Sequence, residues 1–346
     1  MTARSPLFTL LVAGTGLAAL STAAMAQDGQ LIISTWGFNG DILDEVLYAP
    51  FEAEHGVEIV IDQGNNADRL NRVRVRDGGV DLIYLADAYA QQAIADGLFQ
   101  EIDRGQIPNI EEIYAVGQAP HGEAYGPAYT IGRYGIVYDS AATDDPVTSW
   151  GDLWREEFAG RVTIPNVSTT AGQLIVLAAG ERAGVDAFEN PDAAFAELEA
   201  LAPNVLTAYG RSSELVNLFA QGEVVIAAAQ DFVVGSIQEA VPTAVWAPLG
   251  DEAYANLNVI NILEGSDQVE LAHAFINFHL SQPIQHEMAV RGVDAPINRN
   301  VELTEEEAAR WTYGAEVVEA LRLPDYERLN EVGEDWTTRW EAIFAN

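Results

Sequence analysis

Short runs of strand-forming residues alternate with amphipathic helical segments along the first half of the chain. Apolar, β-rich runs occupy residues 31–35, 57–61 and 81–85, and segments with helical spacing of apolar residues cover 41–55, 67–76 and 88–96. Gly56 and Gly97 follow two of these segments, as glycines that end helices do. Regular alternation of this kind predicts an α/β fold with a parallel sheet.

A strand expected at 134–138 leaves this unit, and a second unit follows with strands at 162–164, 205–208 and 224–229 and helices at 172–183, 191–201 and 214–220. A strand at 259–263 and a helix at 268–280 are expected to return to the first lobe, and a mostly helical, acidic segment covers 304–344. A single hydrophobic core stops growing at about 250–300 residues. We therefore expect two lobes, residues 27–132 plus 259–308 and residues 133–258, with C-terminal helices of 309–346 packing on them. Chain crossings near 131–135 and 254–259 predict a strand hinge.

The N-terminus has the order of features found in a secretory signal. Arg4 precedes an apolar stretch at 7–20, and the small-residue site at 24–26 precedes Gln27. Gly14 and Gly16 interrupt the apolar stretch, which is shorter than the roughly 20 residues of a membrane span. We expect cleavage after residue 26 and release into the periplasm. The sequence has no Cys to carry a lipid anchor.

The charge of the chain is strongly unbalanced. All 17 basic residues are Arg, 53 residues are Asp or Glu, and the net charge is −36. Such a surface stays soluble in high salt, which suggests a halophilic or marine source. It offers no basic face for nucleic acid. Neither disulfides nor thiol catalysis is possible without Cys.

Ligands of open α/β sheets bind beyond the carboxyl ends of the strands. The residues that this rule selects are Trp36, Asp87, Tyr89, Ser168, Thr169, Thr170 and Asp231. Tyr254, Arg133 and Arg211 lie near the crossings or near a strand end and join the candidates.

The candidate side chains suit a small amine or zwitterion better than a sugar. The aromatic rings could face an apolar or cationic group, and the Asp carboxylates could pair with an ammonium. The hydroxyls at a helix start could hold an anion, and either Arg could clamp a carboxylate. Structural roles compete with each of these: helix caps for Asp87 and Ser168–Thr170, surface ion pairs for the two Arg, and packing between lobes for Trp36.

Several motifs resemble bacterial spermidine/putrescine-type solute-binding proteins. The strongest is VTSWGDLW at 147–154 followed by FAGRV at 158–162; ADGLF at 95–99, YGP at 125–127, QGEV at 221–224 and AFINF at 274–278 are also similar. They follow one another in order along nearly the whole mature chain. The resemblance implies a type II periplasmic-binding fold and delivery of a solute to a membrane permease with an ATPase.

The resemblance also implies site positions. It adds Asn256 at the second crossing and Asp294 late in the chain, and it places Val167 and Thr170 where that family has paired acids. A long polyamine needs a carboxylate for each amine, because an isolated buried ammonium is costly. The ligand expected is therefore a polyamine-like amine or a zwitterion, with γ-aminobutyrate, opines and aminoalkylphosphonates as options.

Two alternatives remain open at this point. A ferric-ion-binding protein of the same fold would need clustered Tyr with His or carboxylate ligands, whereas the five His are scattered along the sequence. A secreted hydrolase would need a nucleophile elbow, a zinc motif or a similar signature, and none occurs. We expect a monomeric binding protein with no catalytic residues, metal or cofactor.

Overall fold

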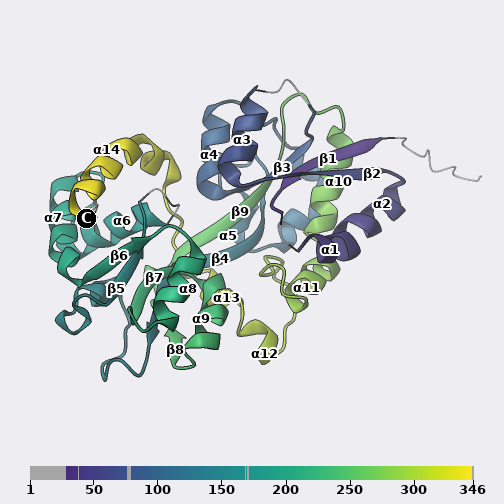
Figure 1. Ribbon diagram of the computed structural model, residues 1–346. Helices are drawn as coiled ribbons and strands as arrows, with labels where there is room; N and C mark the ends of the chain where they lie inside the picture. The colour runs from purple at the N-terminus through teal and green to yellow at the C-terminus, as the bar shows by residue number, and fades with distance from the viewer. Residues whose placement is uncertain (1–28, 38, 76–78, 168, 170, 345–346) are drawn as a thin grey trace, which may run out of the picture.

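The computed structural model describes residues 29–344 except 38, 76–78, 168 and 170. Within these residues one mixed sheet of nine strands runs through the whole molecule (Figure 1). The strands are β1 (Gln30–Thr35), β2 (Glu58–Gln63), β3 (Leu82–Ala86), β4 (Ala128–Asp139), β5 (Val162–Pro165), β6 (Val205–Tyr209), β7 (Ile226–Gln230), β8 (Ala244–Trp246) and β9 (Tyr254–Ile262). The predicted signal segment, 1–26, lies outside the described residues.

The sheet is parallel within each half and antiparallel at the junction. Its order is β2-β1-β3-β9-β4-β7-β5-β6, with β8 also paired to β4. β1 pairs with β2 and β3 in parallel, as β5 does with β6 and β7. β9 and β4 run antiparallel to each other and to their other neighbours. The α/β prediction is confirmed, and the strands of the first unit pair in parallel as expected. The antiparallel strands β4 and β9 return between the halves.

Helices cover the sheet in both halves. Their bounds are α1 (Gly40–Leu43), α2 (Ala49–His55), α3 (Asn66–Val75), α4 (Asp87–Ala95), α5 (Ala115–Gln118), α6 (Gly172–Ala183), α7 (Pro191–Leu201), α8 (Ser212–Ala220), α9 (Val234–Ala240), α10 (Val269–His279), α11 (Gln282–Val290), α12 (Glu305–Ala308), α13 (Ala315–Val318) and α14 (Tyr326–Phe344). The expected helix 41–55 forms with a π turn at Asp44–Tyr48, ahead of Pro50. Much of 304–325, expected to be helical, is irregular instead.

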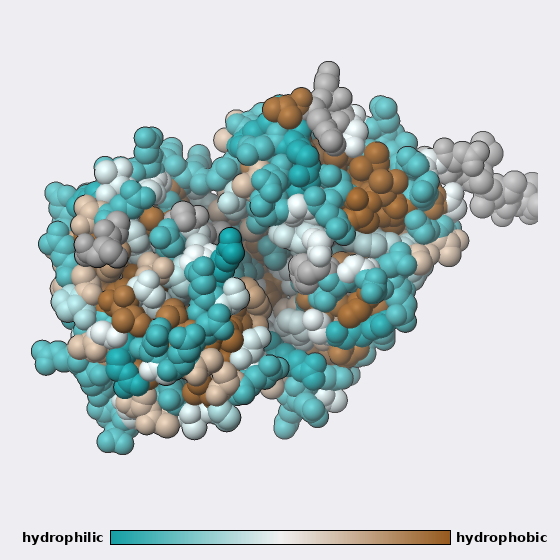
Figure 2. All heavy atoms as spheres, in the orientation of Figure 1, coloured by the Kyte–Doolittle hydropathy of each residue, from teal (hydrophilic) through white to brown (hydrophobic). Residues whose placement is uncertain are grey.

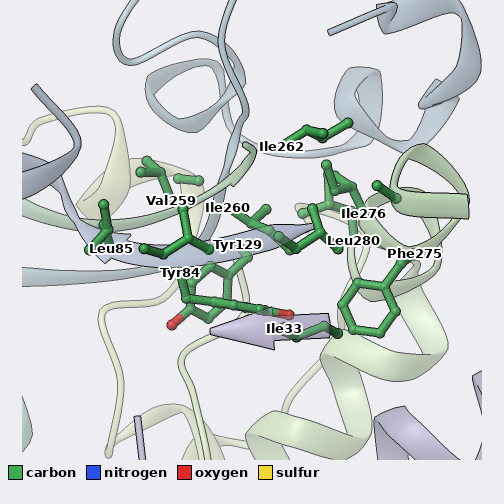
Figure 3. Packing of buried hydrophobic residues seen from close by; sticks show 14 of the residues in the cluster. Ile33, Tyr84, Leu85, Tyr129, Val259, Ile260, Ile262, Phe275, Ile276 and Leu280 are labelled. Atoms are coloured by element: carbon green, nitrogen blue, oxygen red, sulfur yellow. The ribbon is translucent and has the colours of Figure 1, made fainter. Parts of the chain in front are cut away.

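Two large hydrophobic cores lie at opposite ends of the sheet. One gathers buried residues from 31–131 and 255–318, and the other gathers buried residues from 134–254 and 326–340. Figure 3 shows the first core, where Tyr84 and Tyr129 lie beside Ile33 and the aliphatic side chains of β9. Trp336 and Trp340 of α14 are almost fully buried in the second core. Each half therefore has its own apolar interior.

The strands β4 and β9 connect these cores. They pair along Ala128–Tyr134 and Tyr254–Val259, and each contributes residues to both cores. Gly126, just before β4, approaches β9 so closely that a Cβ there would lie 1.8 Å from the Ile260 carbonyl oxygen. The two strands are the candidates for a hinge, and the lobe limits at 132/133 and 258/259 stay a prediction.

Candidate functional site

A cavity of about 620 Å³ opens between the two halves, directly over β4 and β9. Figure 2 shows a furrow separating the halves on one face of the molecule. The residues around the cavity are mostly aromatic, amide or acidic: Trp36, Asn39, Asn66, Ala86, Tyr129, Thr130, Ile131, Gly132, Tyr134, Gln230, Asp231, Phe232, Asn256, Asn258, Gly292, Val293, Asp294, Ala295 and Trp311. We refer to this cavity as the cleft. Its volume suits a small organic solute.

Trp36 forms an aromatic wall of the cleft. It follows β1 and packs edge-on against Tyr84, with ring centroids 6.4 Å apart, and lies 6.5 Å from Tyr129. The guanidinium of Arg69 lies 4.6 Å from the centroid of the Trp36 ring. Arg69 is completely buried and donates to the backbone carbonyls of Gly64, Ser34 and Tyr84. These contacts fix the ends of β1 and β3, and with them the Trp36 ring.

Asp294 projects into the cleft without a protein partner. Its carboxylate makes no hydrogen bond or ion pair with any of the described residues, although it retains some solvent access through the cleft. Burial raises its pKa from the usual 3.8 to about 7. Tyr48, Tyr84 and Tyr129 lie close enough for this carboxylate to raise their own pKa values further. A nearby cationic group would stabilise the ionised form of this carboxylate.

Asp231 faces the cleft from the second half. It follows β7, accepts a hydrogen bond from the Thr312 hydroxyl, and accepts others from the backbone N–H groups of Arg133 and Phe232. Burial raises its pKa, and these hydrogen bonds together with the charge of Arg133 act in the opposite direction. Gly132 leaves room for it, because a Cβ there would lie 2.9 Å from Asp231 Oδ1. The carboxylate is therefore held in one place before any ligand arrives.

The electrostatic character of the cleft follows from its lining. Asp231 and Asp294 are its charged residues, and no Arg, Lys or His lines it among the described residues. Trp36, Tyr129, Phe232 and Trp311 supply ring faces and edges. Carboxylates with aromatic faces bind ammonium groups through ion pairing and cation–π attraction. The lining of the cleft is therefore acidic and aromatic, with no basic side chain among the described residues.

The structure gathers four predicted site residues at the cleft: Trp36, Asp231, Asn256 and Asp294. Arg133 is half-buried and lines an adjoining cavity. Thr169 lines a small pocket of about 160 Å³ beside the cleft, where its hydroxyl donates to the Asn166 carbonyl. Ser168 and Thr170 lie outside the described residues.

Other predicted residues lie elsewhere. Asp87 begins α4 and pairs with His121, with Oδ1 2.5 Å from Nε2, at a separate cavity of about 490 Å³. Tyr89 packs on the first core, and Arg211 is exposed at the start of α8. Tyr254 is buried, and its hydroxyl donates to Glu181 at 3.2 Å.

Some cleft residues carried no signal that selected them from the sequence. Asn39 lies in the turn before α1, and Asn66 begins α3. Trp311 and Thr312 come from the irregular segment after α12. A segment without helical or strand periodicity cannot be positioned in the fold from sequence. The contact of Thr312 with Asp231 could therefore not be predicted. Asn258 could have been found, because it shares one face of β9 with Asn256.

The fold and cleft define a two-lobed receptor of the kind that takes up small solutes. Similarity to known proteins identifies its family. The sequence profile of the bacterial extracellular solute-binding protein family matches residues 47–315. The chain belongs to that family.

The relatives agree with this assignment. The chain is 23% identical over 209 residues to spermidine/putrescine-binding periplasmic protein 1 of Haemophilus influenzae, and the match covers 58% of this chain and 57% of the relative. The chain thus spans less than two thirds of that curated relative's length. These matches confirm the resemblance to spermidine/putrescine-type proteins.

Solved structures confirm the type II periplasmic-binding fold. An ABC transporter structure from Clostridium perfringens is 40% identical with a TM-score of 0.86, covering 91% of this chain and 99% of that one. A spermidine/putrescine ABC transporter substrate-binding protein from Streptococcus pneumoniae has the same fold at 18% identity, with a TM-score of 0.74 over 91% and 99% of the two chains.

Two kinds of feature are absent from the described residues. The described residues contain no group of three or more His, Cys, Asp or Glu placed to hold a metal ion. None of the helices in the described part of the chain has both the length and the apolar character that crossing a bilayer requires.

Proposed function

We propose that this chain is the periplasmic substrate-binding component of an ABC importer, which captures a small amine-bearing solute, polyamine-like or zwitterionic, and passes it to a permease and its ATPase. Membership of the solute-binding family supports the receptor role. The names of the relatives, which are binding and transport proteins, support binding without catalysis.

The observation that carries the ligand class is Asp294. A carboxylate in a largely buried position normally acquires a partner, since an uncompensated buried charge is expensive. Asp294 has none among the described residues, and its pKa is raised to about 7 by burial. An ammonium from solution would supply the missing charge and would pull that pKa down again. The arrangement stores an unfavourable energy that ligand binding releases.

Closure about β4 and β9 completes the site. Trp36 and Asp294 belong to the first half, whereas Asp231 and Phe232 belong to the second. Phe232 is 57% exposed, which is unusual for a large apolar side chain next to a cleft. Rotation of one half toward the other would bring this ring and Asp231 onto a solute that Trp36 and Asp294 already hold.

The export of the chain is part of the proposal. The segment 1–26 has the features of a cleaved signal, and the relatives are named as periplasmic proteins. A monomer is the simplest form in which such a receptor can meet a permease. The strong negative charge of the chain would attract a basic amine over a long range.

Titration calorimetry with the purified mature chain tests the ligand class. The panel holds α,ω-diamines, spermidine, ω-amino acids and ferric citrate. We expect at least one primary amine to bind, and D294N to weaken it by about tenfold or more, since removing one member of a desolvated ion pair costs about 2–5 kcal/mol. Thermal melts establish that D294N remains folded. Binding of ferric citrate with no amine bound would favour the iron alternative, and amine binding untouched by D294N would remove Asp294 from the site.

A further inference from the structure

A second cavity of about 760 Å³ adjoins the cleft. Asp231, Phe232, Gly292 and Trp311 line both cavities, so the two share a wall. The character of the second cavity is different. Arg133 lines its interior, whereas Arg310 and Glu239 are exposed at its edge.

Arg133 is a half-buried cation whose hydrogen-bonding groups are unused. Its guanidinium lies 5.2 Å from the centroid of the Trp246 ring, and its Nε is shielded from solvent with no hydrogen-bond partner in the described part of the chain. None of the described residues accepts a hydrogen bond from its terminal nitrogens either. Burial lowers its pKa. The cost of a shielded donor without a partner therefore falls on Nε, while the terminal N–H groups of the fork remain available to an acceptor in the cavity.

Arg161, Arg299 and Arg310 also have no acceptor among the described residues, but they are exposed to solvent, whereas Arg133 is half-buried. With 53 acidic and 17 basic residues, carboxylates outnumber Arg by about three to one. Arg69, which is completely buried near the cleft, has no hydrogen bond to a carboxylate but donates to backbone and amide oxygens at four places. Asp231 lies near Arg133, yet it takes its hydrogen bonds from Thr312 and from backbone N–H groups. Arg133 is therefore not simply the internal counter-charge of Asp231.

The surroundings of Arg133 hold it in place. A Cβ at Gly135 would lie 2.6 Å from Cζ2 of Trp246, so the indole fits against the β4 backbone only because position 135 is glycine. Trp246 in turn carries the guanidinium on its ring face. An Arg stacked in this way keeps its planar fork of donors free for a bidentate acceptor.

We propose that the second cavity is the anion-binding end of the solute site, where Arg133 binds the carboxylate or phosphonate of a zwitterion whose ammonium lies at Asp294 and Asp231. This inference rests on the proposed function and makes it more specific. The preferred solutes are ω-amino acids and related zwitterions with well-separated charges, because a diamine would place its second ammonium beside Arg133. Like charges in a desolvated site repel strongly.

Calorimetry with matched ligands tests this assignment. Each ω-amino acid of four to six carbons is compared with the diamine of the same length, and with the corresponding aminoalkylphosphonate to learn which acid is preferred. The variants are R133Q, R133K and R182Q. Arg182 is the matched control, because its guanidinium also lies 5.2 Å from a Trp ring, that of Trp154, and it lines none of the cavities described above.

We expect the wild-type chain to prefer a zwitterion to its matched diamine by about tenfold or more, and R133Q to remove that preference by weakening zwitterion binding alone. R133K should restore part of it, and R182Q should change neither affinity. Equal binding of diamine and zwitterion, with R133Q leaving both unchanged, would overturn the anion subsite while the amine receptor stands. If no amine-bearing compound binds to the wild-type chain, the proposed function itself fails.

Discussion

Burial of the Asp294 carboxylate makes folding less favourable at neutral pH. Its pKa is about 7 in the folded chain and 3.8 in its ordinary state. A carboxyl whose pKa rises on folding binds its proton more tightly in the native state. The penalty is absent below pH 4, grows between pH 4 and 7, and is complete above pH 7. A rise of this size corresponds to at most about 4 kcal/mol of lost stability, by the rule of about 1.4 kcal/mol for each pH unit.

D294N should therefore stabilise the ligand-free chain at neutral and alkaline pH. An amide has nearly the same shape and no charge to desolvate, so its melting temperature at pH 8 should exceed that of wild type by several degrees. The two melting temperatures should converge as the pH falls to 4. Thermal melts of both chains across that range measure the difference. A gap that is constant with pH, or a less stable variant at pH 8, would show that Asp294 is not a strained carboxylate.

At the scale of elements, the adjacent strands β4 and β9 both line the cleft. Gly132 of β4 is opposite Asn256 of β9, and a Cβ at 132 would lie 2.9 Å from Asp231 Oδ1 and 3.5 Å from Asn256 Nδ2. Contacts under 3 Å force a neighbour to move. Asp231 is tethered by Thr312, so moving it takes its carboxylate away from its place in the cleft.

G132A should thus weaken solute binding by about tenfold, the equivalent of one lost charge-assisted hydrogen bond, with little change in stability. G333A is the matched control. Gly333 lies in α14, where a Cβ meets only the flexible end of Gln173, 3.1 Å away. Calorimetry and thermal melts of both variants check this expectation. Indistinguishable affinities for G132A and G333A would mean that the position of Asp231 does not matter to binding.

The elements themselves could largely be predicted from sequence. α6 and α7 begin and end at the expected residues, because each has a continuous apolar face and clear ends: Gly184 stops α6, and Pro191 opens α7. The antiparallel direction of β4 and β9 could not be predicted, since strand pairing is a long-range property. The π turn at Asp44–Tyr48 likewise left no mark in the apolar spacing.

The whole-molecule arrangement explains which site residues could be predicted. The strand-end rule found Trp36 and Asp231 because it depends on local order alone. Tyr254 shares its strand face with Asn256, but it lies further into the second half, where Trp150 packs beside it with centroids 6.2 Å apart. Trp311 reaches the cleft from a segment without periodicity. The positions of the strand ends could therefore be predicted from sequence. Which of these strand ends face the cleft depends on tertiary packing and could not.

The central claim is that two halves close on an amine-bearing solute about β4 and β9. Small-angle X-ray scattering of the mature chain, with and without a saturating amine ligand found by calorimetry, tests it most directly. We predict a smaller radius of gyration with ligand for the wild-type chain, and for D294N the same decrease only at ligand concentrations about tenfold or more higher. Superimposable scattering curves for the free and saturated wild-type protein would contradict closure.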